Sequence, residues 1–220
     1  MKANAGVVIT GQRVTLVPYE TQHVAKYHNW MKDPWLQGNC NIWQQDDGIG
    51  ATIDRRGVGD AKVVERRRRE YELSNAEDQC TFIVLEKSEG DGKPGASYVD
   101  ESAVDRMAGD VNLFFNDYDD PKACEMEIMI AEEKYRRKGF AKEAVKLMMA
   151  YATSKLHVTR FVCKIIETND ASLQLFEKLG YVKYNYVAAF KQIEMELVTK
   201  DKRTELVDGV LKSAVVHAPQ

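Results

Sequence analysis

The sequence lacks the features of a membrane or secreted protein. No run approaches 18 apolar residues, which is close to the length that a helix needs to span a bilayer. The first eleven residues do not contain the apolar stretch of a secretory signal. We therefore expect a soluble, cytoplasmic protein with no membrane partner.

The sequence also has no excess of positive charge and no clustered metal ligands. Its 31 basic and 34 acidic residues give a formal net charge of -3, which argues against nucleic acid as a partner and mildly favours a basic one. The basic run Arg66–Arg69 has no interleaved aromatic residues, so a solvated helix face is favoured over a binding patch. We expect reduced thiols, no metal and no disulfide framework, because C-x-x-C spacing is absent from Cys40, Cys80, Cys124 and Cys163.

The length of 220 residues fits one domain with room for an insertion. Residues 38–69 mix glycines with polar residues and show neither helical nor strand periodicity, so we expect a loop or insertion there. The segment 200–220 is polar and is expected to be a frayed tail. The sequence therefore predicts a single domain over residues 1–199.

Strand and helix patterns alternate along the rest of the chain. Strand patterns occupy residues 14–18, 81–85, 108–115, 124–131, 161–166, 181–190 and 192–198, the last two as a closing hairpin. Helical patterns occupy residues 21–31, with Thr21 as the expected cap, and residues 141–156 and 170–179. Helices that alternate with strands in this way predict a mixed α/β sheet with helices packed on it.

The junction between the strand at 124–131 and the helix at 141–156 is suited to binding a phosphate. The N–H groups at a helix start are unpaired and lie at the positive end of the helix dipole. A glycine allows a ligand to approach this backbone closely, and three cations add positive charge. The junction has the sequence Arg136-Arg137-Lys138-Gly139-Phe140-Ala141.

A second motif follows 28 residues after Ala141 and makes a family resemblance specific. The segment from Asn169 to Tyr181 resembles the Asn-x-x-Ser-x-x-x-(Phe/Tyr)-x-x-x-Gly-(Phe/Tyr) signature of GNAT acetyltransferases. Residues 136–141 resemble the pyrophosphate motif that this family uses for acetyl-CoA. The resemblance implies a GNAT fold, with a mixed and mostly antiparallel sheet of about six or seven strands and helices on both faces. It also implies acetyl-CoA as the co-substrate and no metal.

Other stretches resemble narrower groups of this superfamily. Val14–Pro18 and His28–Pro34 resemble the branch that includes bacterial ribosomal-protein alanine acetyltransferases. Closer similarity, to the N-acetyltransferase 9-like family, includes Leu16–Tyr19, Cys80–Leu85 and Gly109–Phe114. That resemblance implies acetylation of a protein N-terminus, with tubulin as the assigned substrate. The match is lost between Leu36 and Glu70, where either an unusual segment reshapes substrate access or the gene model is irregular.

The resemblance also implies how the co-substrate is held. The strand at 124–131 is expected to splay from the strand at 161–166, and the pantetheine arm to fill the opening. The expected contacts are the backbone of Met129, Ile130 and Ala131 for the arm, and Arg136, Arg137, Lys138, Gly139, Phe140 and Ala141 for the pyrophosphate. Asn169 is expected to orient an amide of the cofactor, and Ser172 to lie near the sulfur.

Two carboxylates and one hydroxyl are the candidate catalytic groups. Acetyl transfer needs a neutral amine, and Glu125 and Glu127 share one face of their strand as candidate bases. Glu125 matches a glutamate of the bacterial alanine branch, whereas Glu127 lies nearer the expected thioester; either one is alternatively a solvent-facing carboxylate. Many relatives protonate the departing thiolate with a tyrosine where this chain has Phe176. Ser172 occupies the Asn-x-x-Ser position that serves this role in some relatives, so the resemblance implies that it is the candidate acid, unless it is only a first-turn helix residue.

Two other functions remain open at this stage. One is acetylation of a small amine or a lysine side chain, because the same cofactor-binding half serves many acceptors. The other is a catalytically weak acyl-CoA-binding scaffold, which the missing hydroxyl at Phe176 and the unusual region 38–69 make credible.

Overall fold

The computed structural model describes residues 4–39, 79–93, 95–199, 210 and 215–217. The expected insertion at 38–69 lies outside the described residues, except that residues 38 and 39 end a helix. The basic run Arg66–Arg69 and most of the expected tail at 200–220 also lie outside them. The expected boundaries of the insertion and the tail therefore stay predictions.

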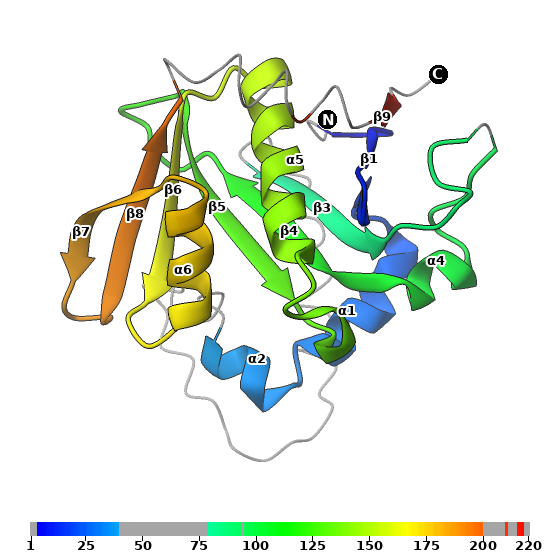
Figure 1. Cartoon of the computed structure of the whole chain (residues 1–220), viewed down its shortest axis with the longest axis horizontal. Helices are drawn as coiled ribbons and strands as arrows, with labels where there is room; N and C mark the ends of the chain where they lie inside the picture. The colour runs from blue at the N-terminus through cyan, green and yellow to red at the C-terminus, as the bar shows by residue number, and fades with distance from the viewer. Residues whose placement is uncertain (1–3, 40–78, 94, 200–209, 211–214, 218–220) are drawn as a thin grey trace.

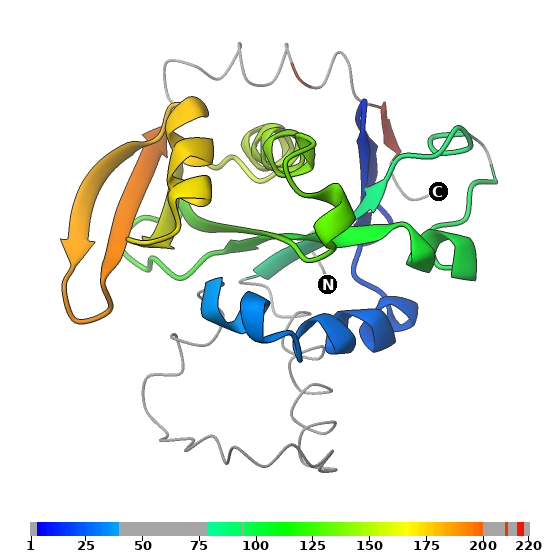
Figure 2. The same cartoon turned by 60° about the horizontal axis from the view of Figure 1, so that its bottom comes forward.

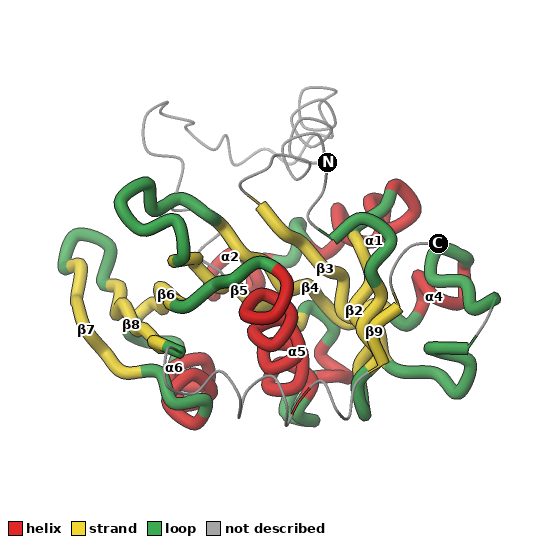
Figure 3. Tube along the Cα trace, turned by 90° about the horizontal axis from the view of Figure 1, so that it is seen from above, coloured by secondary structure: helices red, strands yellow, loops and turns green. Residues whose placement is uncertain are grey.

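A nine-stranded sheet forms the centre of the fold, in the order β7-β8-β6-β5-β4-β3-β2-β1-β9. Figure 3 shows β7, β8 and β6 at one end of this sheet and β2 and β9 at the other. Neighbouring strands are antiparallel, except for the parallel pair β5 and β6. The strands are β1 (Val8–Thr10), β2 (Val14–Pro18), β3 (Gln79–Glu86), β4 (Met107–Phe114), β5 (Ala123–Ile130), β6 (Arg160–Ile166), β7 (Val182–Val187), β8 (Gln192–Val198) and β9 (Val215–His217).

Helices cover both faces of the sheet, as Figure 2 shows. One face carries α5 (Phe140–Lys155) and α6 (Asp170–Lys178), and the other carries α1 (Val24–Trp30) and α2 (Pro34–Asn39). A short helix α4 (Glu101–Asp105) precedes β4, and the single turns η1 (Thr21–His23) and η3 (Glu133–Tyr135) precede α1 and α5. The predicted fold class, a mixed and mostly antiparallel sheet between helices, is confirmed.

Side chains alternate along β5, and this alternation determines which residues lie on each face of the sheet. Cys124 and Met126 point to the core beneath α5 and α6, while Met129 joins the smaller core beneath α1 and α2. Glu125, Glu127 and Met129 occupy every second position of the strand, so their side chains point to the same face. The two candidate bases therefore lie on the α1–α2 face of the sheet.

Some elements differ from those predicted. The sheet gains β1 and β9, which pair antiparallel with each other, so three residues of the expected tail form an edge strand. Strands of three residues are too short to show a period in the sequence. Thr21 does not cap the first helix, because the Glu20 carboxylate accepts the His23 N–H and the His23 ring accepts the Glu20 N–H in a reciprocal capping box.

β5 and β6 pair over only part of their length. Their register runs from Ala123 opposite Arg160 to Glu125 opposite Val162, and beyond it the two strands diverge (Figure 1). On its other side β5 lies very close to β4: a Cβ atom on Gly109 would lie 1.8 Å from the Met129 carbonyl oxygen. The sheet is therefore tightly packed between β5 and β4, and it is open between β5 and β6 beyond Glu125.

Candidate active site

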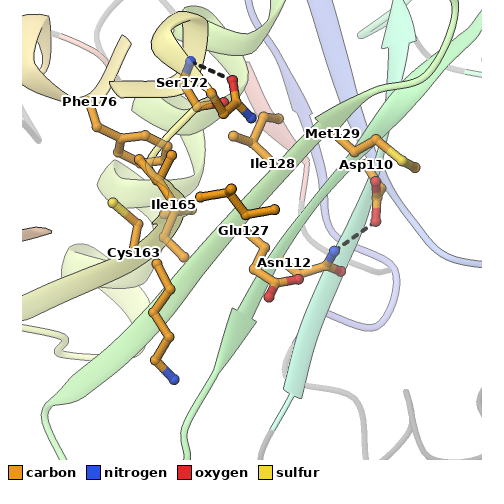
Figure 4. Close-up of a pocket in the computed structure, with 13 residues that line it drawn as sticks. Asp110, Asn112, Glu127, Ile128, Met129, Cys163, Ile165, Ser172 and Phe176 are labelled. Atoms are coloured by element: carbon orange, nitrogen blue, oxygen red, sulfur yellow. Dashed lines mark hydrogen bonds between the residues drawn. The ribbon is translucent and has the colours of Figure 1, made fainter. Parts of the chain in front are cut away.

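A pocket occupies the opening between β5 and β6 (Figure 4). β4, β5, β6 and α6 all contribute to its lining. Four predicted site residues, Glu127, Met129, Asn169 and Ser172, lie in this lining. The lining consists of Asp110, Asn112, Met126, Glu127, Ile128, Met129, Cys163, Lys164, Ile165, Ile166, Asn169, Ser172 and Phe176.

Glu125, the first of the two candidate bases, lies outside the pocket lining and is 4% exposed. Its Oε2 accepts hydrogen bonds from Lys164 Nζ at 2.9 Å and from Asn116 Nδ2 at 3.2 Å. Lys164 belongs to β6, so the ion pair joins the two strands at the place where they separate. Because Glu125 lies outside the pocket lining and in an ion pair with this lysine, it is poorly placed to contact a substrate.

Glu127 has a different environment. Its carboxylate lines the pocket and has no hydrogen-bond partner among the residues that the structure describes. Burial, together with the nearby negative charges of Glu125 and Asp110, raises the pKa of Glu127 from 4.5 to about 8. A carboxylate with a pKa in this range is matched to proton transfer near neutral pH.

Two further polar residues, Asp110 and Asn112, stand beside Glu127 on β4. Asn112 lies directly opposite Glu127 in the sheet register, and Asp110 lies opposite Met129. Asp110 Oδ2 accepts hydrogen bonds from Asn112 Nδ2 at 2.7 Å and from Tyr27 Oη of α1 at 3.2 Å. Burial raises the pKa of Asp110 to about 6. Neither residue is among those predicted from the sequence, although polar residues at alternate positions of an apolar strand are a recognisable signal.

The α6 side of the pocket carries Asn169 and Ser172. Asn169 is the N-cap of α6, and its Oδ1 accepts the Ser172 N–H at 3.1 Å. Ser172 lines the pocket with its side chain half-buried. Phe176, one turn further on, packs edge-on against Tyr181, whose hydroxyl lies 3.7 Å from Met149 Sδ in the core. Ser172 is thus the hydroxyl that α6 presents to the pocket.

The loop before α5 has the geometry of an anion-binding helix start. Gly139 is the N-cap residue with φ +85°, and Arg137 also has a positive φ, of +60°. The N–H groups of the first turn of α5, which begins at Phe140, precede the first hydrogen bond within the helix. Arg137 and Lys138 are exposed, and no atom lies within 4 Å of a Cβ position on Gly139. The predicted residues from Arg137 to Ala141 therefore form an accessible, positively polarised stretch of backbone, which fits a pyrophosphate.

Arg136 differs from the other two cations of this loop. Its Nε and a terminal nitrogen donate hydrogen bonds to the carbonyl oxygens of Ile130, at 3.0 Å, and Ala131, at 2.6 Å. Its guanidinium lies 3.7 Å from the ring centroid of Trp35 on α2. Arg136 therefore joins the end of β5 to α2, which is a structural contact that the sequence did not predict.

No group of three or more His, Cys, Asp or Glu residues that could hold a metal ion occurs in the described ranges. Within the same ranges, no helix is long and apolar enough to cross a bilayer.

Comparisons with known proteins agree with this geometry. The family model of the acetyltransferase (GNAT) domain matches residues 13–182. An N-acetyltransferase 9-like protein of Nematostella vectensis is 39% identical over 200 residues, which cover 89% of this chain and 88% of that protein. Alpha/beta-tubulin-N-acetyltransferase 9 of Mus musculus is 34% identical over 203 residues, which cover 91% of this chain and 75% of that protein.

Solved structures show the same fold. The chain matches an acetyltransferase of the GNAT family from Bacillus anthracis with a TM-score of 0.61 and 14% identity, over 88% of this chain and 99% of that one. It matches spermidine N-acetyltransferase from Vibrio cholerae, in complex with CoA and spermine, with a TM-score of 0.59 and 15% identity, over 84% and 95% of the two chains. The chain is therefore an acetyltransferase that belongs to the GNAT family and, within it, to the N-acetyltransferase 9-like group.

Proposed function

We propose that this enzyme transfers the acetyl group of acetyl-CoA to the α-amine of a protein N-terminus, with tubulin as the first acceptor to test. The observation that carries the proposal is the pocket between the diverging strands β5 and β6, with the Glu127 carboxylate in its wall. Relatives from mouse and human are named alpha/beta-tubulin-N-acetyltransferase 9, which supports tubulin as the acceptor. A tubulin acceptor implies that the enzyme works in the cytoplasm.

The residues around the pocket fit acetyl-CoA. The N–H groups at the start of α5, with Arg137 and Lys138, would hold the pyrophosphate. The backbone from Met129 to Ala131 is the proposed contact of the pantetheine arm, which would lie along β5 as an added strand. Asn169 and Ser172 would lie near the thioester, which supplies the activated acetyl group.

Glu127 is the proposed base. An α-ammonium group in the pocket loses one proton to the Glu127 carboxylate, and the neutral nitrogen then attacks the thioester carbonyl carbon. A carbon–nitrogen bond forms, the carbon–sulfur bond breaks, and the amine's second proton leaves as the amide forms. Ser172 donates a proton or a hydrogen bond to the departing sulfur. In sum, an ammonium ion and a thioester give an amide, a thiol and one proton.

The test is the release of free CoA when the full chain is mixed with acetyl-CoA and a panel of amines. The panel contains peptides with tubulin N-terminal sequences, the same peptides with a blocked N-terminus, peptides with an internal lysine, and polyamines. We expect turnover on free α-amines only, and its loss in Glu127→Gln. Turnover on lysine or polyamines alone would favour the other acceptor classes, and tight acetyl-CoA binding without turnover on any amine would favour a scaffold.

A further inference from the structure

Asp110 has a carboxylate oxygen that the fold leaves without a partner. The residue is 1% exposed, and its Oδ2 accepts hydrogen bonds from Asn112 and Tyr27. Its Oδ1 is buried and has no hydrogen-bond partner among the described residues. A buried acceptor left without a donor is costly, so native structures rarely retain one without a use for it.

The free oxygen belongs to a residue of the pocket wall. Asp110 lines the pocket and lies opposite Met129 in the register, two residue pairs along from Asn112 and Glu127 (Figure 4). Met129 is part of the β5 backbone along which the pantetheine arm is proposed to lie. Asp110 therefore stands beside both the proposed base and the proposed path of the thioester.

The charges around the pocket favour a cationic ligand. The ionisable groups that interact with Asp110 are Tyr27 from α1, which donates a hydrogen bond to it, and Glu127 from β5, whose pKa its charge raises. Lys164 from β6 lines the same pocket. Lys164 is already in an ion pair with Glu125. The carboxylates of Asp110 and Glu127 have no such partner in the part of the chain that the structure describes. A primary ammonium group has three N–H donors, enough to reach both carboxylates at once.

We propose that Asp110 binds the acceptor: its Oδ1 accepts an N–H of the substrate's ammonium group while Glu127 takes the proton that must leave. The inference rests on the proposed function only in placing the acceptor in this pocket. It adds a recognition element, because the pocket then selects a free, positively charged primary amine and rejects a neutral or acylated nitrogen. Asn112 and Tyr27 become positioning residues that fix the orientation of the carboxylate.

The variant Asp110→Asn tests this directly. An asparagine can keep its carbonyl oxygen toward the donors of Asn112 and Tyr27, which places its NH₂ group where Oδ1 was. The internal hydrogen bonds then remain, while the free position changes from an acceptor to a donor. Asp119→Asn is the matched control, because Asp119 is an exposed carboxylate in the turn between β4 and β5.

The measurement is equilibrium binding, by calorimetry, of free-amine peptides and a polyamine to the full chain in the presence of CoA, so that it does not depend on turnover. We expect Asp110→Asn to raise the Kd of the best free-amine ligand by about tenfold or more, because the complex loses a charge-assisted hydrogen bond. The Kd of acetyl-CoA should match that of the wild type, and the Tm at pH 7 should not fall, because the substitution removes a buried carboxylate whose pKa is raised by burial. Asp119→Asn should change none of the three quantities.

The outcomes separate this inference from the proposed function. If a free-amine ligand binds tenfold more weakly to Asp110→Asn, the inference holds, even if the wild type turns over no amine. If the wild type acetylates peptides and Asp110→Asn binds them unchanged, the inference is wrong while the function stands. If no cationic amine binds the wild type, the inference is also wrong. Should Asp110→Asn lose its fold, Tyr27→Phe provides the test. Without the Tyr27 hydroxyl the Asp110 carboxylate loses a donor that fixes its orientation, so the Kd of the amine should rise while that of acetyl-CoA stays unchanged, and an unchanged Kd of the amine would contradict the inference.

Discussion

Lys164 Nζ lies 2.9 Å from Glu125 Oε2, and this ion pair connects β5 to β6 just where their pairing ends. Because of this contact, Glu125 and Glu127 have different roles although they lie only two residues apart. Glu125 holds the strands together, while Glu127 remains available to a ligand in the pocket.

The first prediction separates the two glutamates by substitution. Glu127→Gln should lower kcat by about 100-fold or more, because it removes the proposed base without changing the shape of the side chain. Glu125→Gln should lower the free energy of unfolding and reduce kcat much less. Steady-state kinetics and thermal unfolding of both variants provide the measurement. A larger loss of kcat in Glu125→Gln would reverse the assignment.

The second prediction concerns the pH dependence of the reaction. A base with a pKa of about 8 must lose its proton to act, so kcat/KM should rise with pH up to about pH 8. Lys164 lowers the pKa of Glu127, and Lys164→Met should therefore move this rise to higher pH. The substrate's own amine titrates identically with both enzymes, so a profile that does not differ between them would contradict the role of Glu127.

Lys164→Met should also destabilise the fold, which is the third prediction. The side chain of Glu125 is 5% exposed and that of Lys164 is 30% exposed, so the substitution leaves a buried carboxylate without its cation. We expect the free energy of unfolding at pH 7 to fall by about 2 kcal/mol, less than for a fully buried pair because solvent reaches the lysine. Urea titration measures this, and the double variant with Glu125→Gln should recover part of the loss.

The fourth prediction is the effect of Glu127 on stability. Its pKa is higher in the folded chain, about 8 against 4.5, so between these values the folded state holds more protons than the unfolded state. The contribution of this group to the free energy of unfolding is therefore present at low pH and is lost as pH rises toward 8. Glu127→Gln does not titrate, so its Tm advantage over the wild type should grow from pH 5 to pH 9. Parallel melting curves in one buffer series test this, and an advantage that stays constant would contradict the raised pKa.

The fifth prediction distinguishes the three cations of the loop before α5. Arg136→Lys should lower Tm, because a lysine cannot bridge the carbonyl groups of Ile130 and Ala131 while stacking on Trp35. Arg137→Gln should leave Tm unchanged and raise the Kd of acetyl-CoA by about fivefold, an effect that added salt reduces. Calorimetric titration at two salt concentrations checks both. If Arg137→Gln binds acetyl-CoA as tightly as the wild type, the loop does not hold the pyrophosphate as proposed.

The sequence was sufficient for features that short segments determine. The strand 124–131, the cationic loop and the helix that follows are signalled by local periodicity and a glycine, and the structure places all three within two residues of the predicted limits. The different environments of Glu125 and Glu127 could not be predicted in this way. They depend on Lys164, which is 39 residues away from Glu125 in the chain, and on the contact of Asp110 with Tyr27, which is 83 residues away. Such contacts exist only after the sheet has assembled.

The close approach at Gly109 limits how this enzyme can change over evolution or by engineering. Any side chain at that position would meet the Met129 carbonyl oxygen, and relief would require β5 to shift away from β4, toward the opening that faces β6. The width of the opening therefore depends on the β4 side of β5, where the absence of a side chain at Gly109 allows the two strands to approach closely. New acceptor preferences would have to come from the residues that face the opening, because replacing Gly109 would narrow it for every substrate.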